Sequence, residues 1–368
     1  MQKPDFGNYT AEQLRQILSR IDRERFPDRV QEIQARLARL EAERLARTES
    51  QAPGLDPGST AIAGFWRRSG AFLIDILVLG LVGYGLGLLL HAQFAALGAG
   101  GRAVGFVIAL AYFGSMDSRL FEGRSVGKRA LDIRVADARG RPLSVRKALL
   151  RSTVFCIPYF LNGIALGDGQ TGLLFPVIQA LAVFVLGGAI CYLFLFNRRT
   201  RQSIHDLLVG ALVVHGSSTA LAQPAPLWRG HLAILTAWCV LAVGALAYLH
   251  SRLDAGILRP LMDVQQQVNR LPGIRTASIV EGSHFASGDK RTRFVAIQAV
   301  NGRDAVDQNT IARDIARIVL LAYPRAQKLD AISVSVMEGY DIGIASNWRI
   351  RTFSSTPDAW RKALAGQD

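Results

Sequence analysis

The chain has 368 residues, half of them hydrophobic, and its 43 lysines and arginines against 29 aspartates and glutamates give a formal net charge of +14. In a soluble protein such a charge would indicate nucleic-acid binding, because basic patches bind polyanions. Here the basic residues lie mostly beside long apolar runs, where the positive-inside rule and anionic headgroups explain them better. We therefore expect a multi-pass membrane protein with polar ends. Its expected partners are the lipid bilayer and anionic headgroups, with no nucleic acid.

The three cysteines, Cys156, Cys191 and Cys239, each lie in an apolar run, and none has a neighbour at metal-ligand spacing. We therefore predict no disulfide and no metal site. Residues 1–60 lack the apolar core of a cleavable signal peptide. The first span is thus expected to act as its own insertion signal.

Residues 1–50 predict a cytoplasmic pair of helices. Thr10 and Gln13 have the spacing of a capping box, and Pro27 interrupts the helical pattern. The second helix carries apolar residues at a 3-4-3 spacing, namely Val30, Ile33, Leu37 and Leu40. This spacing suits a hairpin that packs on itself and also a coiled coil that binds a partner, and both readings are open. Residues 51–64, rich in proline and glycine, predict a linker.

The first apolar run, from Ser69 to Leu90, is long enough to cross a bilayer, and it contains one carboxylate, Asp75. Arg68 precedes this aspartate by about two helical turns, so both side chains are expected on one face of the helix. An aspartate at the centre of a membrane helix costs about 2.5–3.5 kcal/mol. Asp75 is therefore predicted to be paired, to face a cavity, or to be protonated. Gly83-x-x-x-Gly87 fits the spacing that permits close helix contact.

Further apolar segments bring the predicted number of transmembrane helices to about five. They cover residues 103–116, 145–166, 173–196 and 230–249. Residues 117–151 contain ten lysines or arginines against four acids, which indicates a cytoplasmic segment. The membrane domain is therefore expected over 65–216, with 217–250 holding a linker and the last span. Five spans from a cytoplasmic N-terminus put residues 251–368 outside, unless the helix around Arg151 fails to cross.

The cytoplasmic segment contains a basic turn shaped by glycines. Lys128 and Arg129 end the sequence that starts at Gly123, and Ile133 and Val135 then alternate with charged residues. We expect a turn and a short hairpin against the membrane face. Because the full P-loop pattern is missing, contact of this turn with lipid headgroups is a better prediction than a phosphate site.

Residues 251–368 predict a soluble α+β domain. The expected order is a helix over 252–271, strands over 275–281 and 292–300, a helix over 308–322, and two further strands that turn at Glu338-Gly339. We expect helices on an antiparallel sheet. No catalytic constellation stands out, so neither an enzyme nor a cofactor is predicted.

Three motifs in order resemble the RDD family of bacterial polytopic membrane proteins. They are Arg68-x-x-Ala71-x-x-Ile74-Asp75, then Gly123-x-Ser125-x-Gly127-Lys128-Arg129 with Ile133-x-Val135, and then Gln202-Ser-Ile-His205-Asp206. The resemblance covers about residues 62–216. It implies that the arginine and the two aspartates that name the family are Arg68, Asp75 and Asp206 here. It also implies the bacterial inner (plasma) membrane. The family is usually described as of unknown function, with transport suggested and some members linked to cation/proton exchange.

Two classes of function are compatible with these features. In the first, Asp75 binds a proton or a small cation, and the core helices transport a cation or solute in exchange for protons. In the second, the chain is a non-catalytic scaffold or assembly factor that anchors the outer domain and binds protein partners. Five spans are few for a transporter unless it forms a homo-oligomer. Asp206 is expected to cap a helix or to pair with Arg129 or Arg134 rather than to act in catalysis with His205.

Overall fold

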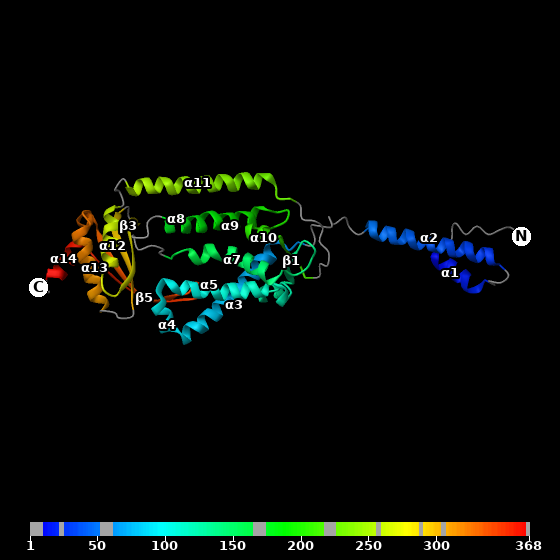
Figure 1. Cartoon of the computed structure of the whole chain (residues 1–368), viewed down its shortest axis with the longest axis horizontal. Helices are drawn as coiled ribbons and strands as arrows, with labels where there is room; N and C mark the ends of the chain where they lie inside the picture. The colour runs from blue at the N-terminus through cyan, green and yellow to red at the C-terminus, as the bar shows by residue number, and fades with distance from the viewer. Residues whose placement is uncertain are drawn as a thin grey trace. The chain divides into compact units, whose positions relative to one another are not determined.

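The computed structural model describes residues 10–21, 26–51, 62–164, 174–216, 226–254, 259–286, 290–302 and 307–365. The chain divides into two compact units, Met1–Thr60 and Ala61–Asp368, and each is considered by itself. Figure 1 shows the elements of both in chain order.

The first unit is a pair of helices, α1 (Ala11–Arg20) and α2 (Pro27–Gln51). Thr10 and Gln13 form the capping box that their spacing predicts. Leu14 of α1 and Ile33 of α2 are fully buried against each other's helix, with neighbouring leucines and isoleucines around them. The apolar seam therefore closes on itself within the unit, as the hairpin reading expects. Binding of a partner along α2 stays a prediction. Of the predicted linker, 51–64, residues 52–61 lie outside the described residues, and Ile62 and Ala63 pair with β2 of the second unit rather than forming a free linker.

The second unit begins with a helical bundle. Its helices are α3 (Phe65–Leu89), α4 (His91–Leu97), α5 (Gly101–Met116), α6 (Val126–Ala130), α7 (Val145–Leu161), α8 (Leu174–Ala180), α9 (Gly187–Phe196), α10 (Ile204–Val209) and α11 (Arg229–Asp254). A π-helical turn, Leu181–Leu186, joins α8 to α9 without a break. It packs against α11, where the Trp238 indole N–H donates to the Phe184 carbonyl at 3.1 Å.

Three helices of the described residues are long and apolar enough to cross a membrane. They cover Phe65–Leu89, Phe175–Phe196 and Arg229–Leu249, and α4 with α5, which meet at a bend of 112°, would make a fourth. The predicted number of about five is thus not confirmed. The predicted span that is missing from this count is α7, a helix of 17 residues whose first half contains Arg146, Lys147 and Arg151. It is nevertheless packed along α5 over most of its length (Figure 1).

The short strand after the basic turn does not form the local hairpin that we expected. β1 (Ile133–Asp137) pairs in antiparallel register with β2 (Ala211–His215), about 80 residues further on. Asp137 instead closes a tight turn, since its carboxylate accepts from the backbone N–H groups of Arg139 and Arg141 at 2.9 Å each. The apolar residues of the ladder that pack with the helices, Ile133, Val135, Ala211 and Val213, are buried. The ladder thus ties the basic turn before β1 and the Gln202–Asp206 motif before β2 to one end of the bundle.

The C-terminal domain contains α12 (Arg259–Asn269), β3 (Ile274–Ala286), β4 (Lys290–Asn301), α13 (Gln308–Ala322), β5 (Ala331–Asp341), β6 (Ser346–Ser355) and α14 (Pro357–Ala365). The predicted order of elements is present, followed by α14, which was not predicted. In place of the single expected helix over 252–271, α11 extends to Asp254 and α12 begins at Arg259, and the residues between them lie outside the described ranges. A single apolar core joins the sheet to α12, α13 and α14.

Two expectations about this sheet were wrong. The strand order is β3-β4-β5-β6, and the central pair β4–β5 is parallel, because α13 carries the chain back across the sheet between them. The turn between β5 and β6 is not at Glu338-Gly339. Both strands continue past that point, and Gly339 is a strand residue whose φ of 144° brings its backbone close to the Asn347 carbonyl.

Candidate functional site

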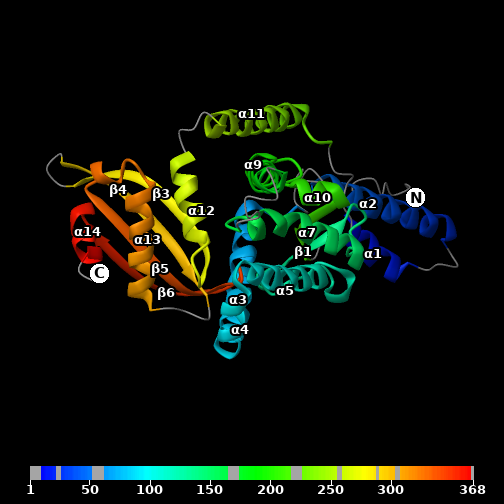
Figure 2. The same cartoon turned by 60° about the vertical axis from the view of Figure 1, so that its left-hand side comes forward.

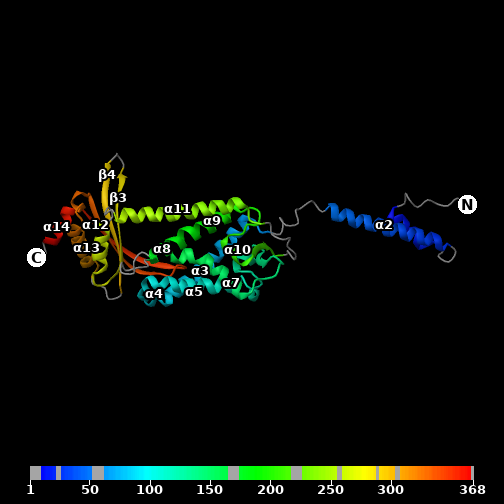
Figure 3. The ribbon, with the colours of Figure 1, turned by 45° about the horizontal axis from the view of Figure 1, so that its top comes forward.

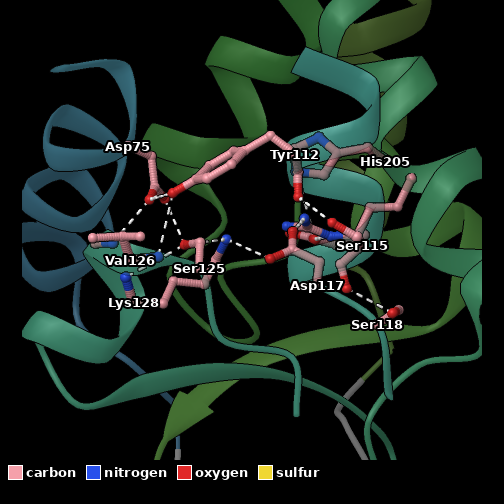
Figure 4. Close-up of polar contacts among 12 residues, drawn as sticks. Asp75, Tyr112, Ser115, Asp117, Ser118, Ser125, Val126, Lys128 and His205 are labelled. Carbon is pink, nitrogen blue, oxygen red and sulfur yellow. Dashed lines mark hydrogen bonds and ion pairs between the residues drawn. The ribbon is translucent and has the colours of Figure 1, made fainter. Parts of the chain in front are cut away.

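Asp75 is almost completely buried in α3, and its hydrogen-bond donors are all neutral (Figure 4). The Tyr112 hydroxyl donates to one carboxylate oxygen at 2.7 Å, and the Gly127 backbone N–H donates to the same oxygen at 2.8 Å. The Ser125 hydroxyl donates to the other oxygen at 2.6 Å. The carboxylate is therefore well satisfied, although no basic side chain of the described residues lies within ion-pair distance.

These donors come from a segment that fits tightly against α3. Ser125 caps α6, and its hydroxyl accepts from the Lys128 backbone N–H at 3.4 Å. A Cβ atom on Gly127 would lie only 1.9 Å from the Ala71 carbonyl oxygen, so only glycine lets α6 approach closely enough to reach Asp75. The G-x-S-x-G motif is thus a cradle for the carboxylate.

Asp117 follows α5 and is fully buried. One of its oxygens accepts from the Lys128 ammonium at 2.6 Å, and the other accepts from the Arg151 guanidinium at 2.5 Å. The same ammonium lies 3.3 Å from the Ser125 hydroxyl, which connects Asp117 to the Asp75 cradle (Figure 4). Asp117 is therefore a central link between α5, α6 and α7.

Asp206 is the third buried carboxylate. Arg151 donates to one of its oxygens at 2.8 Å, and Arg68 donates to the other at 3.1 Å. The Ser203 backbone N–H also donates to Asp206 at 3.2 Å, which makes this carboxylate part of the α10 N-cap, as expected. The expected pairing with Arg129 or Arg134 was wrong, because Arg68 and Arg151 occupy the carboxylate.

The network formed by these side chains alternates in charge and is neutral as a whole. It contains three cations and three carboxylates, which are Arg68, Arg151 and Lys128 with Asp75, Asp117 and Asp206. All six are at most 9% exposed. Buried charges are tolerated when they are paired and hydrogen-bonded, so the neutral total explains how so many lie inside an apolar bundle. We call these six side chains the charge network.

His205 lies next to the charge network with its imidazole against the Phe155 ring. Burial lowers the pKa of His205 from its ordinary 6.5 to about 3, against the opposing effect of Asp206. Burial alone would raise the pKa of Asp206, but its basic neighbours and the Ser203 N–H outweigh this and hold the pKa well below its usual range. At neutral pH the histidine is therefore uncharged and the aspartate ionised, and a histidine whose pKa is so far below neutral pH is a weak general base.

The predicted site residues are brought together in part. Arg68 and Asp75 share the buried face of α3, as their spacing predicts, but Arg68 bonds with Asp206 and the Arg201 carbonyl instead of with Asp75. Lys128 points into the network, where its ammonium bonds with Asp117 (Figure 4), and contact of the basic turn with headgroups stays a prediction. Arg129 is exposed and stacks near the Phe121 ring, so it is not part of the network.

Sequence reasoning missed Asp117 and the role of Arg151. The sequence carried a signal for both, because Asp117 directly follows one predicted apolar segment and Arg151 lies near the start of another, where an unpaired charge would be costly. Tyr112 offered no signal, since one tyrosine in an apolar run is ordinary.

The opposite end of the bundle holds a second candidate feature, a notch lined by glycines. The buried face of α3 ends in Gly83 and Gly87, and α5 contributes Gly101 and Gly105. The turn between β5 and β6 fills this notch (Figure 2). A Cβ on Gly105 would lie 1.6 Å from the Ile342 carbonyl oxygen, and one on Gly83 would lie 2.9 Å from the Ala345 side chain. The glycines at GxxxG spacing thus pack against a β-turn instead of against another helix.

Polar contacts complete the docking of this turn, which we call the hairpin tip (residues 341–346). The Arg102 guanidinium donates twice to Asp341, at 2.8 and 2.9 Å, and also bonds with carbonyls at the end of α7. The Tyr159 hydroxyl donates to the Gly343 carbonyl at 2.6 Å. Ile342 is fully buried. The tip is therefore held by α3, α5 and α7 together, at the end of the bundle remote from the charge network.

The comparisons with known proteins bear on the bundle alone. The family model described as RDD family matches residues 62–210, which include every member of the charge network and the notch glycines but not the hairpin tip. Comparison with curated proteins and with solved structures finds no match. The RDD match and the apolar helices together identify a membrane protein.

Proposed function

We propose that the RDD-family segment of this chain, residues 62–210, is the anchoring half of a membrane platform that fixes the C-terminal α+β domain at one end of its helices. The observation that carries the proposal is the hairpin tip, buried in a notch that only glycines leave open. A domain tethered by a flexible segment alone would need no such fit.

The charge network supports a structural role for the other end. It joins α3, the segment around α6, α7 and α10 through a closed set of pairs. Such a set fixes the relative positions of the helices on which the notch depends.

The proposed orientation follows from charge. Residues 117–151, with ten basic against four acidic side chains, lie at the network end and are assigned to the cytoplasm. The hairpin tip and the C-terminal domain are then on the outer face of a bacterial inner membrane. In this arrangement α7 crosses with α5, and the N-terminal helix pair is cytoplasmic.

A disulfide test measures the anchoring directly. In a variant without the three native cysteines, Gly83→Cys and Ala345→Cys bring two thiols together in the notch. A Cβ atom on Gly83 would lie 2.9 Å from the Ala345 Cβ atom, closer than the roughly 3.5–4.5 Å of a disulfide, so the hairpin tip must shift by about 1 Å to form the bond. Oxidation in native membranes should join them quantitatively, as read by mass spectrometry of the linked peptides. The matched control is Gly85→Cys with Ala345→Cys, because Gly85 faces open space. Equal linkage of the two pairs would contradict the anchoring.

A second candidate function, proton-coupled transport of a small cation or solute, is favoured by one observation. Asp75 has only neutral donors, so among the six network members it is the one whose charge no direct ion pair compensates. Sodium and proton flux into vesicles that hold the purified protein would test this. Transport requires flux that Asp75→Asn abolishes and that exposed Asp132→Asn leaves intact. Absence of flux in the wild type excludes it.

A further inference from the structure

One face of the C-terminal sheet is left uncovered. Side chains alternate along each strand, and α12, α13 and α14 all pack on the face that carries Val295, Val334 and Phe353. The opposite face, which we call the open face, includes Val280 on β3 and Ile350 on β6, each 58% exposed. Apart from the part next to the hairpin tip, where α3, α4 and α5 contact β5 and β6, no described element of the chain covers this face.

The open face is amphipathic in a regular way. The register places Val300, Met337 and Ile350 in one row across β4, β5 and β6. The next row contains Gln298, Ser335 and Thr352, and the hydroxyls of the last two lie 2.9 Å apart. Ser333 and Ser354 continue this hydroxyl surface with a 2.7 Å contact. The apolar row is the one nearer the hairpin tip, and the hydroxyl rows are further away.

The open face is directed toward the bundle. Figures 1 and 3 show α13 and α14 on the side of the sheet away from the bundle, so that the sheet lies between them and the ends of the long helices. Two contacts fix this placement, the buried hairpin tip and the Arg275 guanidinium, which donates to the Ala96 carbonyl at 2.7 Å. The bundle does not cover Val280 or Ile350. Both side chains are therefore exposed on the side of the sheet that faces the ends of the apolar helices.

We infer that the open face rests on the phospholipid headgroups of the leaflet that surrounds this end of the bundle. Exposed apolar side chains beside hydrogen-bonding groups are typical of a membrane-contacting surface, and Trp348, two residues before Ile350 on the same face, suits the interface between lipid and water. The hydroxyl and amide side chains provide donors for phosphate and carbonyl oxygens. The inference rests on the proposed anchoring, because the hairpin tip brings the sheet to the bilayer surface.

A fluorescence experiment tests the contact. An environment-sensitive fluorophore is attached to Val280→Cys or Ile350→Cys in the full chain without native cysteines, reconstituted in nanodiscs with one copy each. The matched control is Leu321→Cys, an equally apolar and 81% exposed site on α13, which covers the other face. Phospholipids that carry a spin label on the headgroup should quench the first two sites several-fold more than the third. Quenching of Val280→Cys and Ile350→Cys no stronger than that of Leu321→Cys would overturn the inference.

The anchoring and the lipid contact can fail separately. In the same nanodiscs, the cysteine pair at Gly83 and Ala345 reports whether the hairpin tip is docked. A docked tip with unquenched open-face sites rejects the lipid contact and retains the anchoring, and such an open face would be available to a protein partner. An undocked tip rejects the anchoring and with it the basis of the inference. Docking with strong quenching at both open-face sites supports both.

Discussion

The two ends of the helical bundle are held by different physical means. At the network end, three cations and three carboxylates neutralise one another inside an apolar environment. At the notch end, the hairpin tip fits against glycines, and the ion pair between Arg102 and Asp341 is partly exposed. The first end depends on charge and the second on shape.

This difference follows from what each end must bury. At the network end, polar loops are buried between apolar helices, and buried polar groups need hydrogen-bond or ion-pair partners. The notch end receives a β-turn whose backbone must approach two helices closely, and close approach requires the absence of side chains. Removing a charge should therefore be most harmful at the first end, and adding volume at the second.

The largest expected effect is that of Asp206→Asn. The substitution leaves Arg68 and Arg151 buried with one carboxylate too few, and loss of one partner of a buried pair costs about 3–5 kcal/mol. We expect a large fall in the thermal unfolding temperature of the protein in detergent, measured by the loss of helical circular dichroism.

Two further substitutions give stability losses with which that of Asp206→Asn can be compared. Asp75→Asn should cost less, about 1–3 kcal/mol, because its partners are neutral and an amide can keep part of the hydrogen bonding. Asp358→Asn, at an ion pair with Arg361 on the surface, should change little. If Asp358→Asn were as harmful as Asp206→Asn, charge pairing would not distinguish the network end.

The next effect is a dependence on pH at the network end. The pKa of His205 is about 3 in the folded protein and near 6.5 in the unfolded chain, so between these values only the unfolded chain binds the proton. Its contribution to stability is thus complete above pH 6.5 and is lost as the pH falls, at up to about 1.4 kcal/mol per pH unit. Denaturation midpoints measured from pH 7 to pH 4 should show this loss.

The variant His205→Gln isolates the histidine from the other titrating groups. It should lose less stability than the wild type over the same pH range, because its amide does not titrate. Parallel pH profiles of the two proteins would show that His205 does not carry the dependence. Asp206 contributes at lower pH, since its depressed pKa moves its own loss of stability below the usual range of an aspartate.

Sequence reasoning found the network end through charges that are costly in a membrane, but it could not assign the pairs. Helical spacing placed Arg68 and Asp75 on one face correctly. It could not reveal that Arg68 would bond with Asp206, 138 residues away. Such pairing depends on how α3, α7 and α10 pack together, and periodicity within one helix carries no information on that.

The notch end was harder to predict, for a physical reason. A glycine stripe indicates close approach but not the element that approaches, and so Gly83 and Gly87 suggested another helix. The C-terminal elements were mostly found because strand alternation and helix periodicity are local patterns. The parallel pairing of β4 with β5 and the position of the turn after Asp341 are properties of the assembled sheet, and no local pattern encodes them.

At the notch end, Gly105→Ala should undock the hairpin tip. The added Cβ would overlap the Ile342 carbonyl, a backbone atom that cannot turn aside, and overpacking of this kind costs about 1–3 kcal/mol. We expect loss of the Gly83–Ala345 disulfide linkage and faster proteolysis of the C-terminal domain, with the bundle intact. Gly100→Ala, where the added methyl meets nothing, is the control. Equal behaviour of the two variants would mean that shape does not hold this end.

The smallest expected effect is that of Arg102→Gln, which removes the ion pair and keeps the shape of the notch. The pair is 18% and 29% exposed at its two side chains, so solvent screens it, and about 1 kcal/mol is expected for the pair and the bonds to the α7 carbonyls together. Arg102→Lys keeps the charge but not the pair of bonds to one Asp341 oxygen, and it should lie between the wild type and Arg102→Gln in the rate of disulfide linkage. If Arg102→Gln weakened docking more than Gly105→Ala, charge and not shape would hold the hairpin tip, and the two ends of the bundle would follow one rule.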